Sequence, residues 1–308
     1  MVNLKDSLAN ATRHLGYFLF LFCPITYVHA KEERNDGKEK IEHIKIGNFA
    51  LPERQEPDPL IGFGQIIVDK GDLQAFLYPD FLKGCNKKFK EVIPLLVRYG
   101  IKDDLTVLIQ LPVAVSFRED HQKSSGAEDL IVLFEWAPYD KDTQTSSNQI
   151  TLVGDVTFPT GSAYKNPPTG FGSPSFLLGS TAAHKDKDWY YWGAIGGVLT
   201  TSHKGTKFGN QALYQLGLCK NISYKTDTYL FNWMLEFDGI YRGRNRILGV
   251  TDKNSGGNQI TVTPSLWFST QKIIIQAGIS AFICQKLFGK QNKNAYYIAL
   301  NFGWTFNS

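Results

Sequence analysis

The chain has 308 residues, of which 43% are hydrophobic and 20% are charged, and its formal net charge at pH 7 is +4. This composition supports a folded core and argues against a wholly disordered chain. The sequence contains no apolar run of 18 residues, which excludes a protein that crosses a membrane with helices. Its basic residues are not gathered on any helical stretch, so no nucleic-acid partner is expected.

Residues 1–30 have the pattern of a secretory signal peptide. Lys5 and Arg13 precede an apolar run over 15–25, and small residues then lead to a cleavage position after Ala30. The mature protein is therefore expected to leave the cytoplasm. The β-strand pattern described below makes the outer membrane of a Gram-negative-type bacterium its expected location.

Residues 31–60 are predicted to be a flexible, charged periplasmic lead. Ten of the fifteen residues from Lys31 to Lys45 are charged, and three prolines follow by residue 59. Such a stretch buries too little apolar surface to offset its chain entropy. The alternative is that this lead folds back as a small plug through the apolar side chains of Ile41, Ile44, Ile46 and Phe49.

From residue 61 to residue 308 a two-residue periodicity recurs, as in residues 295–306, AYYIALNFGWTF. Successive side chains of a strand point to opposite faces, so this stretch has one apolar face and one small or polar face. We expect twelve strands, near 72–82, 89–99, 105–117, 128–137, 149–159, 173–185, 189–200, 210–223, 228–242, 259–269, 272–284 and 295–306.

A β-sandwich would show the same alternation, but strand length and loop pattern favour a barrel. The expected strands run about 10–14 residues, whereas globular strands have about 5–6 and bilayer-crossing strands about 9–11. Long connections also alternate with mostly short ones. The sequence therefore predicts an all-β protein, a transmembrane antiparallel up-and-down β-barrel of about twelve strands.

Prolines interrupt several of these strands. A closed barrel has no edge on which a missing N–H is harmless, so a bulge or a strand end is expected at each. The prolines in question are Pro94, Pro112, Pro159 and Pro264.

Strand parity assigns side chains to the two faces of the barrel. The inward, pore-lining set is Lys90, Arg98, Arg118, Glu135, Asp155, Glu236, Asp238 and Arg242. The lipid-facing aromatic girdle is Tyr99, Phe117, Trp136, Trp189, Tyr241, Trp304 and Phe306. Twelve strands should leave a narrow pore in which these charges set selectivity. The alternative is that the charges pair with one another and nothing passes.

The long connections are basic. On the expected outer side they hold 14 lysine and arginine residues against 3 aspartate and glutamate residues. Contact with the phosphates of outer-membrane lipid and lipopolysaccharide is therefore expected. Cys85 and Cys284 lie near this rim, one strand position apart in a closed barrel, which leaves a disulfide between them open.

Four stretches resemble the outer-membrane transporter family first named for the meta-cleavage pathway of phenol degradation. They are VRYGIKDDLTVLIQLPVAVSF (97–117), SSGAEDLIVLFEW (124–136), GDVTFPTGS (154–162) and GFGSPSFLLG (170–179). The resemblance covers roughly residues 60–306 and implies a barrel that transports small molecules. The chain departs from the usual pattern in ending at Ser308 and not at an aromatic residue. The barrel-assembly machinery is a further partner that such a protein implies.

The favoured function is an outer-membrane channel or transporter for small molecules, with hydrophobic or aromatic ones among the candidates. The runner-up is a non-conducting surface protein whose loops bind lipopolysaccharide or another partner. An outer-membrane hydrolase around His184 is a third, weaker reading, because no Ser, Asp or Glu is spaced to serve that histidine. No catalytic residue, cofactor or metal site is expected, since the sequence has no closely spaced His or Cys pair.

Overall fold

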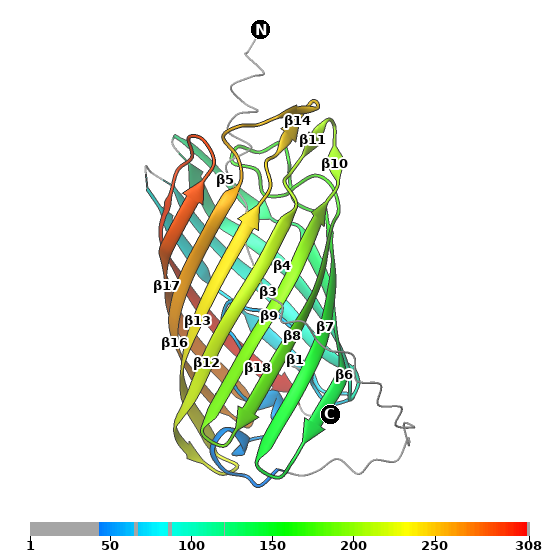
Figure 1. Cartoon of the computed structure of the whole chain (residues 1–308), viewed down its shortest axis with the longest axis vertical. Coiled ribbons are helices and arrows are strands. Elements are labelled where there is room, and N and C mark those ends of the chain that lie inside the picture. Colours follow the sequence, from blue (N-terminus) through cyan, green and yellow to red (C-terminus); the bar gives the residue numbers. More distant parts are fainter. Residues whose placement is uncertain (1–42, 65–66, 86–87, 120, 307–308) are drawn as a thin grey trace.

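A computed structural model describes residues 43–64, 67–85, 88–119 and 121–306. It is a closed barrel of 12 antiparallel strands, which confirms the predicted fold class (Figure 1). Short turns join the strands at one end, which we call the turn end, and long connections join them at the other, which we call the loop end. No helix in the described part of the chain is long and apolar enough to span a membrane.

Two of the twelve positions in the wall are shared by two strands each. β1 and β2 both pair with β18 and β3, and β5 and β6 both pair with β4. The strands are β1 (Leu73–Leu77), β2 (Asp80–Gly84), β3 (Phe89–Lys102), β4 (Leu105–Glu119), β5 (Gln122–Ala127), β6 (Leu130–Asp142), β7 (Ser146–Phe158), β8 (Ser175–Asp186), β9 (Trp189–Thr200), β12 (Gln211–Lys225), β13 (Tyr229–Arg242), β16 (Gly257–Thr270), β17 (Ile273–Leu287) and β18 (Asn294–Phe306).

The predicted strands agree with these positions, and the main difference lies at β6 and β7. Residues 138–148 were expected to be a connection, but β6 continues to Asp142 and β7 begins at Ser146. The register shifts between Trp136 and Tyr139, so a bulge accommodates Pro138 within the strand. The polar residues beyond the bulge then pair normally with β7.

The strand prolines coincide with irregularities in the sheet. Pro94 is paired directly with Pro112, and Pro112 lies where the partner of β4 changes from β6 to β5. β7 ends at Phe158, just before Pro159. The pairing of β16 with β17 skips Thr263 and Pro264. The missing N–H groups therefore fall where the ladder is already interrupted.

The two faces of the wall differ in polarity, as period-two alternation requires. The outward face carries exposed apolar side chains on nearly every strand, among them Leu95, Ile109, Leu216, Leu266 and Phe302. The inward face carries buried amide, hydroxyl and charged groups together with apolar clusters, the larger of which contains Tyr190, Trp192, Met234 and Trp267. An exposed apolar belt on a closed barrel suits contact with lipid.

The described residues of 43–64 and 67–72 run inside the barrel, and we call them the inner segment. It contains two 3-10 turns, η1 (Gly47–Phe49) and η2 (Glu53–Gln55), and Figure 1 shows it in blue at the turn end. The expected mobile lead over 31–60 is therefore wrong for residues 43–60, while residues 31–42 lie outside the described part.

The plug residues considered in the sequence differ in their environment. Phe49 is buried, Ile46 is half-buried, Ile44 is exposed, and Ile41 lies outside the described residues. The composition argument for a mobile lead failed because it treated the charges of this stretch as solvated. In the structure Glu56 and Asp58 meet Lys185 and Arg98 on the inner wall of the barrel, and Arg54 pairs with Asp72 within the segment.

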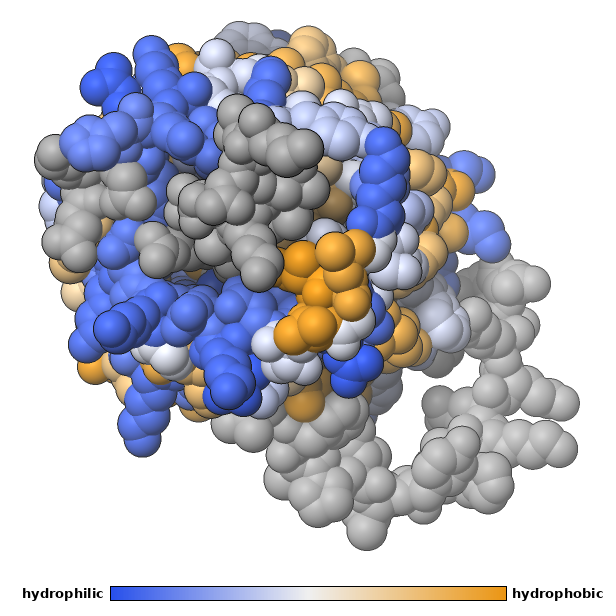
Figure 2. Space-filling view, turned by 90° about the horizontal axis from the view of Figure 1, so that it is seen from above, coloured by the Kyte–Doolittle hydropathy of each residue, from blue (hydrophilic) through white to orange (hydrophobic). Residues whose placement is uncertain are grey.

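At the loop end, two of the long connections join in a small second sheet. It consists of β10 (Ser202–His203), β11 (Thr206–Lys207), β14 (Arg246–Ile247) and β15 (Val250–Thr251). Figure 2 looks onto this end and shows mostly hydrophilic side chains with a hydrophobic patch among them. Leu248 and Val250, near the tip of one hairpin, are both strongly exposed.

The outward wall and the loop hairpin should respond differently to a charge. Leu216 lies near the middle of β12 and is 57% exposed, whereas Leu248 is 73% exposed in the loop hairpin. Leu216→Arg should lower the free energy of unfolding in lipid vesicles by about 2–4 kcal/mol, because an arginine would face hydrocarbon. Leu248→Arg should change it by less than about 0.5 kcal/mol. Urea titration of vesicle-embedded protein, followed by tryptophan fluorescence, measures both, and equal effects would contradict a lipid-facing β12.

Candidate functional site

The inner segment enters the lumen at the turn end, rises to about mid-height and returns to the turn end, where β1 begins. Near its entry, Asn48 N–H donates to the carbonyl of Lys187 in the β8–β9 turn at 2.8 Å. At its highest point, Leu60 N–H donates to Glu236 near the middle of β13. On the way back, Val68 N–H donates to Thr106 Oγ1 near the start of β4.

Polar contacts join the inner segment to most of the wall. Gln55 donates to Thr305 on β18, and the Gln55 carbonyl accepts from Ser269 on β16. Asn232 on β13 donates to Asn48 Oδ1 at 2.6 Å. Contacts with β1, β3, β4, β8 and β17 complete the set. The segment is therefore surrounded by the barrel and not attached to one side of it.

Glycine allows the segment to pass close under one turn. Gly47 has φ of +55°, and a Cβ added there would lie 1.7 Å from the carbonyl oxygen of Lys187. Both the backbone conformation and the close approach exclude a side chain at this position. Prolines at 52, 57 and 59 keep the following stretch out of regular strand pairing.

Three ion pairs hold the middle of the segment. Asp58 lies 3.0 Å from Arg98 on β3, Glu56 meets Lys185 on β8, and Arg54 lies 2.8 Å from Asp72 just before β1. Lys45 and Asp227 form a fourth pair at 2.8 Å near the turn end, but both of its members are well exposed. Buried pairs resist screening, so removing one partner is far more costly there than at an exposed pair.

The highest point of the segment meets two carboxylates on β13. Glu236 accepts hydrogen bonds from the backbone N–H groups of Leu60 and Ile61 at 2.8 and 3.1 Å. Asp238 accepts from Gln215 Nε2 at 2.8 Å. Both carboxylates are buried. The described wall thus presents acceptors at mid-height, and the segment supplies donors to them.

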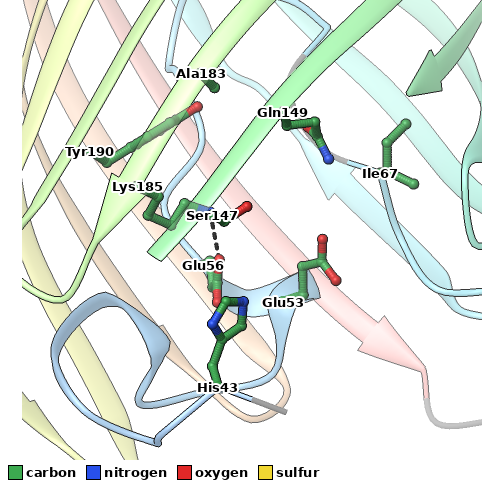
Figure 3. A pocket seen from close by; sticks show the side chains of 9 residues that line it. All are labelled: His43, Glu53, Glu56, Ile67, Ser147, Gln149, Ala183, Lys185 and Tyr190. Atoms are coloured by element: carbon green, nitrogen blue, oxygen red, sulfur yellow. Dashed lines mark hydrogen bonds and ion pairs between the residues drawn. The ribbon is translucent and has the colours of Figure 1, made fainter. Parts of the chain in front are cut away.

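A small pocket lies between the segment and the wall near the turn end. Figure 3 shows His43, Glu53 and Glu56 from the segment facing the same space as Lys185 and Tyr190 from the wall. Burial raises the pKa of the Glu56 carboxyl to about 7, although the nearby Lys185 opposes this shift. Glu56 therefore titrates near neutral pH.

His43 titrates in the same pocket. Burial lowers its pKa, but the hydrogen bond and the charge of Asp142 outweigh burial, and the net pKa is raised above the ordinary value. The closest approach between His43 Nε2 and Asp142 Oδ1 is 3.5 Å.

The structure places the predicted lumen residues as follows. Arg98, Glu135, Glu236 and Asp238 are buried, and Lys90, Asp155 and Arg242 are half-buried. Lys90 pairs with Glu128 at 2.6 Å, and Arg242 donates to Gln259 at 2.9 Å. Arg98 hydrogen bonds to Asp58 of the inner segment, and Glu236 accepts from Leu60 of the same segment.

Two predictions near the loop end of β4 are wrong. Arg118 was expected to face inward but is exposed, and Phe117 was expected to face lipid but is only 2% exposed. The pairing of β4 with β5 shifts in register between Ala114 and Phe117, which reverses the alternation beyond the shift. Simple parity cannot detect such a shift.

The other expected girdle residues lie on the outside of the wall. Tyr99, Trp136, Tyr241, Trp304 and Phe306 are exposed. Trp189 is half-buried and stacks on Tyr191, with 5.7 Å between the ring centroids. Trp136 Nε1 also donates to Asp104 in the β3–β4 turn at 3.1 Å, which places this ring near the turn end.

Several residues that build the site were not predicted. Asp58, Glu56 and Arg54 were assigned to the mobile lead, and Lys185 and Gln215 were not assigned to the lumen. The sequence did carry one signal, because charged residues, one basic and then two acidic, occur at every second position from Arg54 to Asp58. Such spacing between prolines is typical of an extended segment with fixed partners, but it does not name those partners.

Cysteine and histidine residues do not form a reactive centre in the described structure. Cys85, Cys219 and Cys284 are free thiols, so the possible Cys85–Cys284 disulfide is absent. Cys85 N–H bonds to Lys293, whereas Cys284 pairs with Ile260 on β16. His184 is exposed, with its Nδ1 2.8 Å from Asn148 Oδ1. Among the described residues, no three His, Cys, Asp or Glu side chains are grouped to hold a metal ion.

Comparisons with known proteins give structural similarity only. No family model matches the chain, and no curated protein sequence matches it. An outer membrane channel from Pseudomonas putida F1 superposes with a TM-score of 0.64 at 16% identity, covering 82% of this chain and 100% of that one. The NanC porin and LpxR from Salmonella typhimurium give 0.46 and 0.42, at 9% and 8% identity, over 76% and 75% of this chain and 100% of each of theirs. At such identities, the first similarity shows a shared barrel fold.

The buried and the exposed ion pairs of the inner segment should differ in their effect on docking. Asp58→Asn leaves Arg98 without its charged partner, which should weaken docking by about 3–5 kcal/mol. Asp227→Asn, the matched control at the exposed pair with Lys45, should cost less than about 1 kcal/mol. Hydrogen–deuterium exchange of residues 54–62 in the folded barrel should accelerate at least a hundredfold, on the order of 3 kcal/mol, only in Asp58→Asn. Unchanged exchange in that variant would contradict the role assigned to the pair.

Proposed function

We propose that this protein is an outer-membrane channel for small molecules and that its inner segment is a plug, which closes the lumen from the turn end. The turn end then faces the periplasm and the loop end faces outward. The supporting observation is that the inner segment lies in the lower lumen of a closed 12-strand barrel and contacts the wall on several strands around it.

The nature of these contacts favours a plug that can move. Besides apolar packing at Leu60, Ile61 and Phe63, many of the contacts joining the segment to the wall are hydrogen bonds and ion pairs. Water can replace such contacts at little net cost, whereas it cannot replace buried apolar packing. No described residue of the segment belongs to a strand of the wall, so its withdrawal would leave the strand pairs of the barrel in place.

The polar inner face also favours a conducting role. Without the segment, Arg98, Lys185, Glu236 and Asp238 would line the lumen at and below mid-height. Buried charges of this kind are costly unless they are paired or hydrated. In a closed channel the plug supplies partners for most of these groups, and in an open channel water hydrates them. The same wall therefore suits both the closed and the open state.

A second candidate function is loop-mediated binding at the cell surface. The second sheet at the loop end presents the exposed apolar residues Leu248 and Val250, and Lys204 and Arg246 lie nearby in the same sheet. Basic residues around an apolar tip suit an anionic lipid such as lipopolysaccharide. Binding that survives Asp58→Asn but is lost on deletion of 246–251 would favour this function.

Single-channel recording in a planar bilayer tests the channel. Wild-type mature protein should be closed most of the time, and Asp58→Asn should raise its open probability by at least about tenfold, because the plug loses a buried ion pair. Asp227→Asn should behave as wild type. A folded Asp58→Asn barrel that never conducts would contradict the proposal.

The plug should also respond to pH. Because the folded pKa of Glu56 is raised to about 7 and that of His43 is also raised, both groups stabilise docking at acidic pH. This stability is lost as pH rises from about 4.3 through the folded pKa of Glu56. Lys185 and Glu53 face the same pocket, and Asp142 contacts His43. Wild-type open probability should therefore be higher at pH 8 than at pH 5.

Glu56→Gln is the matched variant for this pH effect, because it removes the larger of the two titrations while keeping the side-chain shape. Most of the difference in open probability between pH 5 and pH 8 should disappear in this variant. An unchanged difference would assign the effect to other groups.

A further inference from the structure

Two carboxylates of the wall lie next to the highest point of the plug, and no basic side chain among the described residues pairs with them. Glu236 and Asp238 are two residues apart on β13 and point to the same inward face. Their hydrogen-bond donors include backbone N–H groups of the plug, the Gln215 amide and the Thr263 hydroxyl. Among the described residues, no lysine or arginine side chain hydrogen bonds or forms an ion pair with either carboxylate.

A third acceptor at this site has no partner. Gln215 is 1% exposed and directs its Nε2 toward both carboxylates, at 2.8 Å from Asp238 and 3.4 Å from Glu236. Its Oε1 finds no hydrogen-bond donor among the described residues. The same amide lies against the plug, because a Cβ added at Gly62 would be 2.2 Å from that oxygen. An unpartnered buried acceptor beside two carboxylates indicates a site with capacity for more donors than the plug provides.

An aromatic ring borders these acceptors. Glu236 pairs across the sheet with Gly217, and Gly217 pairs with Trp192 on the next strand, β9. The Trp192 ring lies over Gly217, since a Cβ added at that glycine would be 2.1 Å from the ring. Tyr190 stacks on Trp192 with 4.7 Å between centroids. Ring faces next to carboxylates attract cations by two independent electrostatic effects.

We propose that Glu236, Asp238, Gln215 and Trp192 form a binding site for a small organic cation, an ammonium group on an apolar body, and that Leu60 and Ile61 occupy this site when the channel is closed. The inference rests on the proposed function, because the site becomes accessible only when the plug moves. The backbone N–H groups of the plug then stand in for the N–H groups of the cargo.

The chemistry of the site favours an organic cation over other ligands. A metal ion such as Ca²⁺ requires six to eight oxygen ligands, and the described residues hold no group of three carboxylate, histidine or cysteine side chains. An anion would be repelled by two carboxylates. A neutral apolar molecule would fit the rings but would leave the three acceptors without donors.

Three ligands that share one ring and differ in charge test the proposal. They are 2-phenylethylammonium, neutral 2-phenylethanol and anionic phenylacetate, titrated by calorimetry into the full mature chain in lipid nanodiscs. In Asp58→Asn, in which the plug is loosened, the ammonium should bind at least about tenfold more tightly than the alcohol. Wild-type protein should bind the ammonium about tenfold more weakly than Asp58→Asn, because the plug covers the site.

Wall variants in the Asp58→Asn background locate the binding. Glu236→Gln and Asp238→Asn should each weaken ammonium binding about tenfold. Asp238 accepts no hydrogen bond from the plug in the described structure, so its variant remains informative if Glu236→Gln affects folding. Glu135→Gln removes the same charge from β6, five strands away around the wall, and should weaken binding less than about threefold.

Equal binding of the ammonium and the alcohol, or equal loss in Glu135→Gln and Asp238→Asn, would overturn the proposal and leave Glu236 as a plug anchor only. This test is separate from that of the channel. Conduction without ammonium preference would retain the channel and remove the cargo assignment. Ammonium binding at the wall in a barrel that never conducts would retain the site and remove the channel.

Discussion

The need to pair every backbone N–H and C=O group inside lipid determines this structure. An open sheet cannot meet that need in a bilayer, so the strands close into a barrel. Closure places every second side chain in the interior, and the inward positions here are rich in amide, hydroxyl and charged groups. These groups in turn require partners or water. The inner segment supplies the partners, which explains why a stretch with so many charges and prolines is ordered inside the barrel.

Charge complementarity gives the plug its place. Acidic Glu56 and Asp58 meet basic Lys185 and Arg98, while the plug meets the acidic wall at Glu236 with backbone N–H groups and no basic side chain. The lower wall is thus neutralised by side chains, whereas no basic side chain among the described residues pairs with the two carboxylates at mid-height. When the plug leaves, a cargo with its own hydrogen-bond donors can replace the backbone N–H groups that the plug offers to Glu236. Gating and cargo binding would then compete for the same acceptors.

The sequence predicted the barrel well because the alternation of apolar and polar residues is a local signal, repeated on each strand. It predicted the inward position of Glu236 and Asp238 for the same reason. It failed at Phe117 and Arg118, where a register shift reverses the faces, and at Asp142, where a bulge carries β6 past Pro138. It also failed for residues 43–60, because the partners of Asp58 and Glu56 lie 40 and 129 residues away. Such contacts depend on the closed barrel, and no local pattern reveals them.

The most direct test of the account is to fasten the plug to the wall. Asn232 on β13 donates a hydrogen bond to Asn48 of the plug, so Asn48→Cys and Asn232→Cys, in a chain with Cys85, Cys219 and Cys284 replaced by serine, would join the plug to β13 through a reducible crosslink. Single-channel current should be absent while the crosslink is intact and should appear in discrete steps after reduction. The same conductance before and after reduction would show that ions do not need the plug to move, which would contradict a lumen closed by its own N-terminal segment.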